Sequence, residues 1–152
     1  MGLRFVIRYL IIPVLFAAFT ISSVHAAEDK VAIIVNNDNT MVRISIDMLK
    51  KMYNNDLLKW PNGKPVILYD LDVYNPLRAA FSMNVLGRRP EKIAEEWAHK
   101  KITNQALNPP HTIKSERLII RRVSMQRGAI GYVSLSRTKG RNDVKVIAIL
   151  NK

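Results

Sequence analysis

The sequence contains no cysteine, so no disulfide bond can support the fold and hydrophobic packing has to hold it together. Histidine is scarce too, with only three in 152 residues. His99 and His111, the two that follow the first 26 residues, lack a spacing such as HxxxH or HExxH that binds metal. We therefore expect both to be surface residues, and we expect neither a metal site nor a cofactor.

Motifs of catalysis are also missing. Ser134 and Ser136 lie near Tyr132, but no GxSxG elbow surrounds them and no activating base can be identified. Asp70 and Asp72 could supply a general acid and a general base, although two acids beside a turn are typical of solvent-facing caps. The sequence predicts no catalytic residues and hence a protein that is not an enzyme.

The first 26 residues have the three parts of a secretory signal peptide. A short segment with two arginines precedes an apolar core at 10–21, and small residues at 24–26 form a cleavage site. The alternative is a membrane anchor, but the apolar stretch is shorter than the ~20 residues that a transmembrane helix needs. We expect cleavage after Ala26, which leaves residues 27–152 as a single domain, and we expect that domain in the periplasm.

Acidic residues are half as frequent as basic ones, 12 against 24, and the net charge is +12. Removal of residues 1–26 leaves a charge of +10. An exported domain with this charge is expected to meet small anions, acidic lipid surfaces or acidic partner proteins. We do not expect nucleic acid as a partner, because no motif of basic and stacking aromatic residues is present. The oligomeric state stays open.

Strand patterns and helix patterns alternate along the remaining chain without a repeat or a linker. β-branched apolar runs predict strands at 30–35, 65–71, 129–134 and 144–150. Helical spacing and caps predict helices after Ser45 and at 76–85, 91–101 and 115–126, with a loop at 108–110. We expect Gly128 to end the last helix in a left-handed conformation. This order predicts an α/β fold with a mixed β-sheet flanked by helices.

The turn after the second predicted strand is the candidate ligand site. Ligands of open α/β sheets collect at the carboxyl ends of strands, where a helix start offers free amide donors to an anion. The candidate residues for a small, phosphate-like anion are Tyr74, Asn75, Leu77 and Arg78. The alternative is that Asn75 only caps the helix and that Arg78 only pairs with Asp70 or Asp72.

A second basic feature is a candidate docking surface. Lys114, Arg117 and Arg121 are spaced so that they share one face of the helix predicted at 115–126. Such a face can approach an acidic surface of a membrane transporter or another envelope protein. A solvated helix face is the alternative.

Two motifs carry a resemblance to a known family. They are the hexapeptide GAIGYV at 128–133 and the turn KWPNGKP at 59–65, in an order of elements that includes a helix with Phe81. With these motifs, the sequence resembles the periplasmic phosphate-binding proteins of ABC importers from about residue 31 to 149. The resemblance implies one lobe of a type II periplasmic binding protein, whose full-length members close two lobes around a solute.

The resemblance breaks at the ligand loop. The phosphate binders carry an arginine and then Ser-Gly-Thr at the start of the helix with the phenylalanine, whereas the matching positions here hold Asn75, Pro76 and Leu77. Pro76 has no amide hydrogen to donate. The sequence therefore leaves two hypotheses open: a solute-binding module for phosphate or another small anion, and a ligand-free module that docks on a membrane sensor, channel or envelope complex.

Overall fold

The computed structural model describes residues 30–151, so the predicted signal peptide and its cleavage site after Ala26 lie outside the described residues. The strands are β1 (Val31–Asn36), β2 (Ile67–Leu71), β3 (His111–Ile113), β4 (Ala129–Ser134) and β5 (Val144–Leu150). The α-helices are α1 (Ile46–Tyr53), α2 (Pro76–Phe81), α3 (Pro90–Ile102) and α4 (Glu116–Met125). A π-helical turn, η1 (Ser82–Leu86), continues α2, and a 3-10 turn, η2 (Leu135–Thr138), follows β4.

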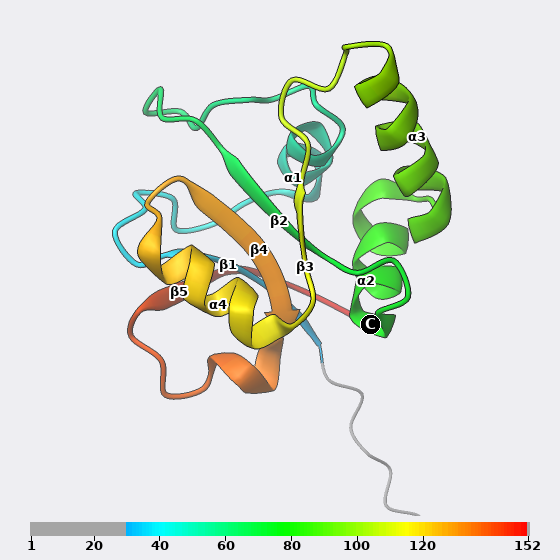
Figure 1. Cartoon of the computed structure of the whole chain (residues 1–152). Coiled ribbons are helices and arrows are strands. Elements are labelled where there is room, and N and C mark those ends of the chain that lie inside the picture. The colour runs from blue at the N-terminus through cyan, green and yellow to red at the C-terminus, as the bar shows by residue number, and fades with distance from the viewer. Residues whose placement is uncertain (1–29, 152) are drawn as a thin grey trace, which may run out of the picture.

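The strands form one mixed five-stranded sheet in the order β3-β2-β4-β1-β5 (Figure 1). β2 runs parallel to both β3 and β4, while β1 runs antiparallel to β4 and β5. All six residues of β1 are buried, as expected for an apolar strand that has neighbours on both sides. The predicted α/β class and the mixed sheet are confirmed.

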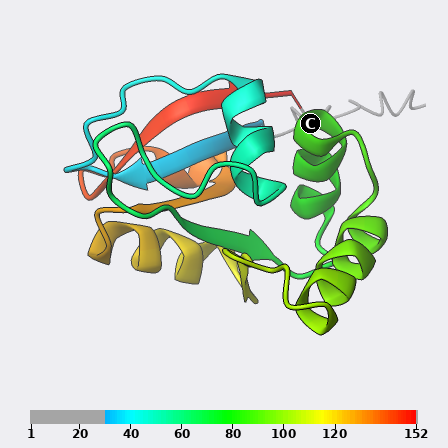
Figure 2. The ribbon, with the colours of Figure 1, turned by 90° about the horizontal axis from the view of Figure 1, so that it is seen from above.

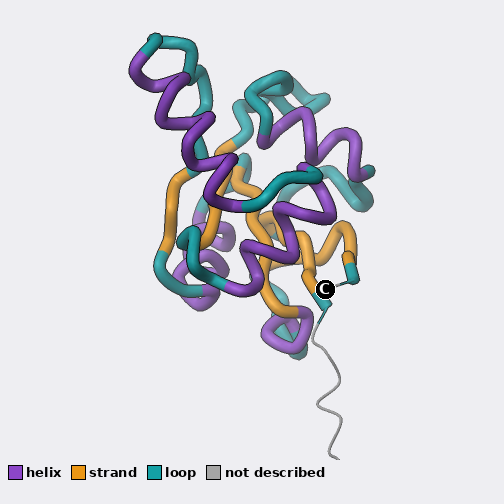
Figure 3. The backbone as a smooth tube through the Cα atoms, turned by 90° about the vertical axis from the view of Figure 1, so that its right-hand side faces the viewer, coloured by secondary structure: helices purple, strands orange, loops and turns teal. Residues whose placement is uncertain are grey.

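Helices cover both faces of this sheet (Figure 2). α4 packs on one face at Gly131 of β4, where a Cβ atom would lie only 2.7 Å from Cγ2 of Ile119. α1 and α2 lie on the other face, and α2 and α3 face the viewer in Figure 3. Within residues 30–151, no helix combines the length and the apolarity that a membrane span requires.

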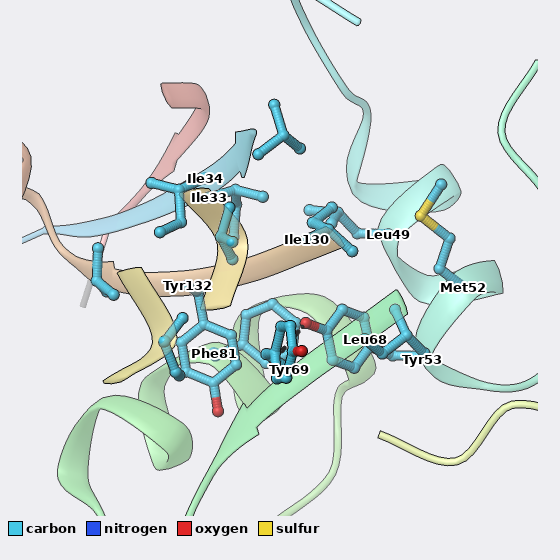
Figure 4. Packing of buried hydrophobic residues seen from close by; sticks show 14 of the residues in the cluster. Ile33, Ile34, Leu49, Met52, Tyr53, Leu68, Tyr69, Phe81, Ile130 and Tyr132 are labelled. Atoms are coloured by element: carbon cyan, nitrogen blue, oxygen red, sulfur yellow. Dashed lines mark hydrogen bonds between the residues drawn. The ribbon is translucent and has the colours of Figure 1, made fainter. Parts of the chain in front are cut away.

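Three aromatic rings join the helical layer to the sheet (Figure 4). Phe81 at the end of α2 stacks on Tyr132 of β4, with ring centroids 4.0 Å apart. Tyr53 of α1 meets the other side of Phe81 edge-on at 4.8 Å. All three rings are buried, so this cluster fixes α1 and α2 against β4 and positions the turn between β2 and α2.

One strand was not predicted, and one expectation about local structure is wrong. The segment after the predicted loop forms the short strand β3, whose three residues are too few to give an alternating pattern. Gly128 does not have the left-handed conformation; α4 already ends at Met125. Glycine is needed at 128 for another reason, because a Cβ atom there would collide with the carbonyl oxygen of Pro65. A left-handed helix end occurs instead at Gly87, after η1, with a φ of 67°.

Candidate functional site

A pocket of about 300 Å³ lies between the carboxyl-terminal end of β2 and the helix α3. The β2 side supplies Asp70 and Asp72, and α2 supplies Arg78. The α3 side supplies Trp97 and Lys101, and the prolines before β3 close a third side. The pocket therefore lies at the end of parallel strands, which is where open α/β sheets bind ligands.

Arg78 and Asp70 form a buried ion pair at this pocket, and each side chain is only 7% exposed. The Nη1 of Arg78 also donates a hydrogen bond to the carbonyl oxygen of Leu71 at 2.8 Å. The Nε of Arg78 is buried and has no hydrogen-bond partner among the described residues. A buried donor without an acceptor is costly, so this N–H is the unsatisfied polar atom at the ion pair.

Tyr132 completes the network around the ion pair. Its hydroxyl donates to the carboxylate of Asp70 and accepts the backbone N–H of Leu71 at 3.2 Å. Burial raises the pKa of Asp70 above its ordinary value, although Arg78 and the hydroxyl of Tyr132 oppose the shift. Burial and the nearby Asp70 raise the pKa of Tyr132 as well, so its hydroxyl stays protonated. The network holds Arg78 in one place at the pocket.

The four predicted ligand residues are separated by the structure. Tyr74 is 86% exposed on the turn, while Leu77 is buried in the core. Asn75 caps α2, because its side-chain oxygen accepts the backbone N–H of Leu77 at 2.9 Å. Of the four, Arg78 lines the pocket, and it pairs with Asp70.

Charges of both signs meet in the pocket. Arg78 and Lys101 stand against Asp70 and Asp72, so the ionised lining residues sum to zero. Asp72 is exposed and already accepts the backbone N–H of Tyr74 at 3.0 Å. Net charge therefore does not favour an anion in this pocket, and a charged solute would have to be bound through individual hydrogen bonds and ion pairs.

The α3 wall was missed as part of a site. Ala94, Trp97, Ala98 and Lys101 line the pocket, at the spacing of one helix face. Lys101 was not predicted to take part in any site. One pattern in the sequence could have indicated Lys101. It lies on the same helix face as the apolar residues Ala94, Trp97 and Ala98, and it places a cation at the end of that face.

Two of the three candidate docking residues lie at a groove beside α4. Arg117 and Arg121 are exposed and line a hollow of about 690 Å³, together with Arg137 and Arg141 from the segment between β4 and β5. Lys114 is exposed but precedes the N-cap Ser115, and it is not among the residues that line the hollow. The structure thus joins two of the three predicted residues with two others.

Metal ligands do not gather anywhere in the described part of the chain: no group of three or more histidine, aspartate or glutamate side chains could hold an ion. His99 and His111 are both exposed. The ring of His111 lies 5.6 Å from that of Tyr69.

Comparisons with known proteins show a likeness of structure. No family model and no curated protein matches the chain. Among solved structures, it is similar to a protein of Clostridium perfringens assigned as a phosphate ABC transporter substrate-binding protein and solved with bound phosphate. The TM-score is 0.62 and the identity 19%, over 78% of this chain and 44% of that protein.

Two further structures agree. An ABC-type phosphate transport receptor from Vibrio cholerae matches 78% of this chain and 45% of its own, with a TM-score of 0.58 and 16% identity. PstS from Borrelia burgdorferi matches 79% of this chain and 47% of its own, with a TM-score of 0.59 and 16% identity. The chain spans less than half the length of each of these proteins. It has the α/β fold of one lobe of such substrate-binding proteins.

Proposed function

We propose that this protein is an exported solute-binding module that takes a small anion, with phosphate as the first candidate, in the pocket between β2 and α3. The observation that carries this proposal is Arg78, which lines the pocket and has a buried Nε–H that lacks an acceptor among residues 30–151. Arg88 has a similar unpaired Nε, but its side chain is 36% exposed and lies elsewhere. An oxyanion on Arg78 would accept a charge-assisted hydrogen bond.

Lys101 supports the same ligand class. Its ammonium group is the second cation of the pocket lining and lies on the wall opposite β2. An anion between Arg78 and Lys101 would be held from two sides, and Trp97 and the prolines would shield it from water. Because Asp70 already neutralises Arg78, we expect weaker binding than in a site with an unopposed arginine.

The likeness to substrate-binding proteins of ABC transporters supports the remaining parts of the proposal. A single lobe with this fold would be exported by the signal peptide at residues 1–26 and would deliver its solute to a membrane transporter. Intact-mass measurement of the protein from the cell envelope should find a chain that begins at Ala27. A mass that includes residues 1–26 would contradict cleavage.

Calorimetry and thermal shifts with phosphate, sulfate and small carboxylates test binding. A ligand at ~100 times its Kd adds about 2.7 kcal/mol to the free energy of unfolding, which shifts the Tm by several degrees. No shift with any of these anions would contradict the proposal and favour the ligand-free docking module.

A conservative variant tests the role of Arg78. Arg78→Lys keeps a cation beside Asp70 but removes the Nε–H, and it should weaken the best anion by roughly tenfold or more, as expected for a lost hydrogen bond of about 1.5–3 kcal/mol. Arg43→Lys is the matched control at an exposed position and should leave affinity unchanged. Lys101→Met provides a second test that does not touch the buried pair. If both pocket variants bind like the control, the site is wrong.

A further inference from the structure

The groove between α4 and the segment 135–143 is built from arginines. Four of them line it, Arg117 and Arg121 from α4 and Arg137 and Arg141 from the other wall, against a single acidic lining residue, Asp143. The chain has as many lysines as arginines, and Lys139 lies within the same segment, but no lysine lines the groove. The choice of arginine matters because its planar fork binds a carboxylate through two parallel hydrogen bonds, which lysine cannot do.

The two α4 arginines are not neutralised. Arg141 pairs with Asp143 at 2.5 Å and Arg137 with Glu116 at 3.3 Å. Arg117 and Arg121 have no acidic partner within 4.0 Å in the part of the chain that the structure describes. They are four residues apart on one helix face, where like charges repel each other. A negatively charged occupant would relieve this repulsion.

The size of the groove narrows the choice of occupant. Its volume of about 690 Å³ is more than twice that of the pocket beside Arg78. A bilayer is flat and would touch the rims of such a hollow, whereas an extended peptide can lie inside it. Leu118, which is 43% exposed, adds an apolar contact at the groove.

From these contacts we infer that the groove docks an acidic, extended peptide segment of a partner protein, whose carboxylates pair with Arg117, Arg121 and Arg137. This surface is separate from the pocket between β2 and α3 and does not depend on whether that pocket binds an anion. The charge complementarity brings the partner close, and the arginine forks fix its register.

Fluorescence anisotropy of the protein purified from the cell envelope, with a labelled hexaglutamate peptide, tests the inference. Hexaglutamate should bind, hexaglutamine should not, and affinity should fall as salt rises from 50 to 200 mM. The double variant Arg117→Gln/Arg121→Gln should lose about tenfold or more in affinity, and Arg137→Gln on the opposite wall should lose several-fold. The matched control Arg43→Gln/Arg89→Gln removes the same charge from exposed positions outside the groove and should stay within about twofold.

Three results would overturn the inference. One is an absence of hexaglutamate binding, and another is an equal loss in the control variant, which would mean that only the net charge of the protein matters. The third is binding to phosphatidylglycerol vesicles that depends on Arg117 and Arg121 while hexaglutamate fails to bind, which would assign the groove to a membrane surface. Circular dichroism of each variant establishes that a loss of affinity does not come from unfolding.

Discussion

The pocket beside α2 and the groove beside α4 both present arginine, but in opposite environments. Arg78 is buried, paired with Asp70 and hydrogen-bonded to the main chain. Arg117 and Arg121 are exposed and lack acidic partners among the described residues. A neutralised buried arginine can select a small ligand by geometry, whereas exposed arginines act at longer range on an acidic partner. The same side chain therefore predicts different functions according to what surrounds it.

The largest difference should appear in stability. Arg78→Met leaves the carboxylate of Asp70 buried without its cation and should lower the free energy of unfolding by about 3–5 kcal/mol. Arg121→Met, the matched change in the groove, should alter it by no more than about 0.5 kcal/mol. Urea unfolding of both variants measures the contrast. Equal, small changes would show that the buried pair has no structural role.

A smaller loss of stability should come from a change on the face of the sheet that α4 covers, and it should affect the groove but not the pocket. Gly131→Ala places a methyl group against Ile119 of α4 and should reduce the free energy of unfolding by about 1–3 kcal/mol. Because the displaced helix carries the groove, hexaglutamate affinity should change, while anion affinity of the pocket should not. Calorimetry with both ligands checks this, and a variant that loses only anion binding would reverse our assignment of faces.

The pH dependence should differ in sign between the two regions. Burial raises the pKa of Asp70 in the folded protein, so its contribution to stability is present below its unfolded pKa of about 3.9 and is lost as pH rises through the folded value. Arg141 lowers the pKa of the exposed Asp143, whose small contribution is present above the unfolded value and lost as pH falls.

Arg78→Met should enlarge the loss of stability with rising pH that Asp70 causes, because Asp70 then lacks the cation that opposes the rise of its pKa. The destabilisation caused by Arg78→Met should therefore grow between pH 4 and pH 7 in urea unfolding. Asp143→Asn is the control, and the destabilisation that it causes should not grow in the same way between pH 4 and pH 7. A destabilisation by Arg78→Met that is the same at both pH values would contradict a raised pKa of Asp70.

The smallest predicted effect is an increase in stability. Arg117→Gln removes one of two like charges at i,i+4 spacing and should increase the free energy of unfolding by about 0.2–0.5 kcal/mol at low salt. The increase should vanish at high salt, where the repulsion is screened. Thermal unfolding at two salt concentrations measures it. A decrease in stability would show that Arg117 has a stabilising partner.

Much of this fold could be predicted from the sequence, because its strands are long apolar runs with clear turn residues. The bounds predicted for β4 and β5 agree with the structure. β3 could not be found, since it has three residues, of which only Ile113 is apolar, and it is a strand only by pairing with β2. The predicted role of Gly128 failed because a close approach to a distant carbonyl leaves no local signal.

The sites were predictable only in part. The sequence alternatives for Arg78 included a pair with Asp70, and that pair forms. Lys101 and Arg137 could not be assigned, because tertiary packing alone brings them to the pocket and to the groove. Local spacing shows which side chains share a helix face, but not which distant segment supplies the opposite wall.

The place of β1 in the sheet has a consequence for how the chain folds. β1 is the first strand to be synthesised, yet both of its neighbours, β4 and β5, come from the last part of the described chain, and Val31 pairs with Leu150. Contacts of such high sequence separation form slowly. Until β5 is available, an apolar strand without polar side chains before Asn36 lacks its neighbours and is prone to aggregate. The nascent protein should therefore remain unfolded until β4 and β5 have been synthesised, and it should depend on chaperones during that interval.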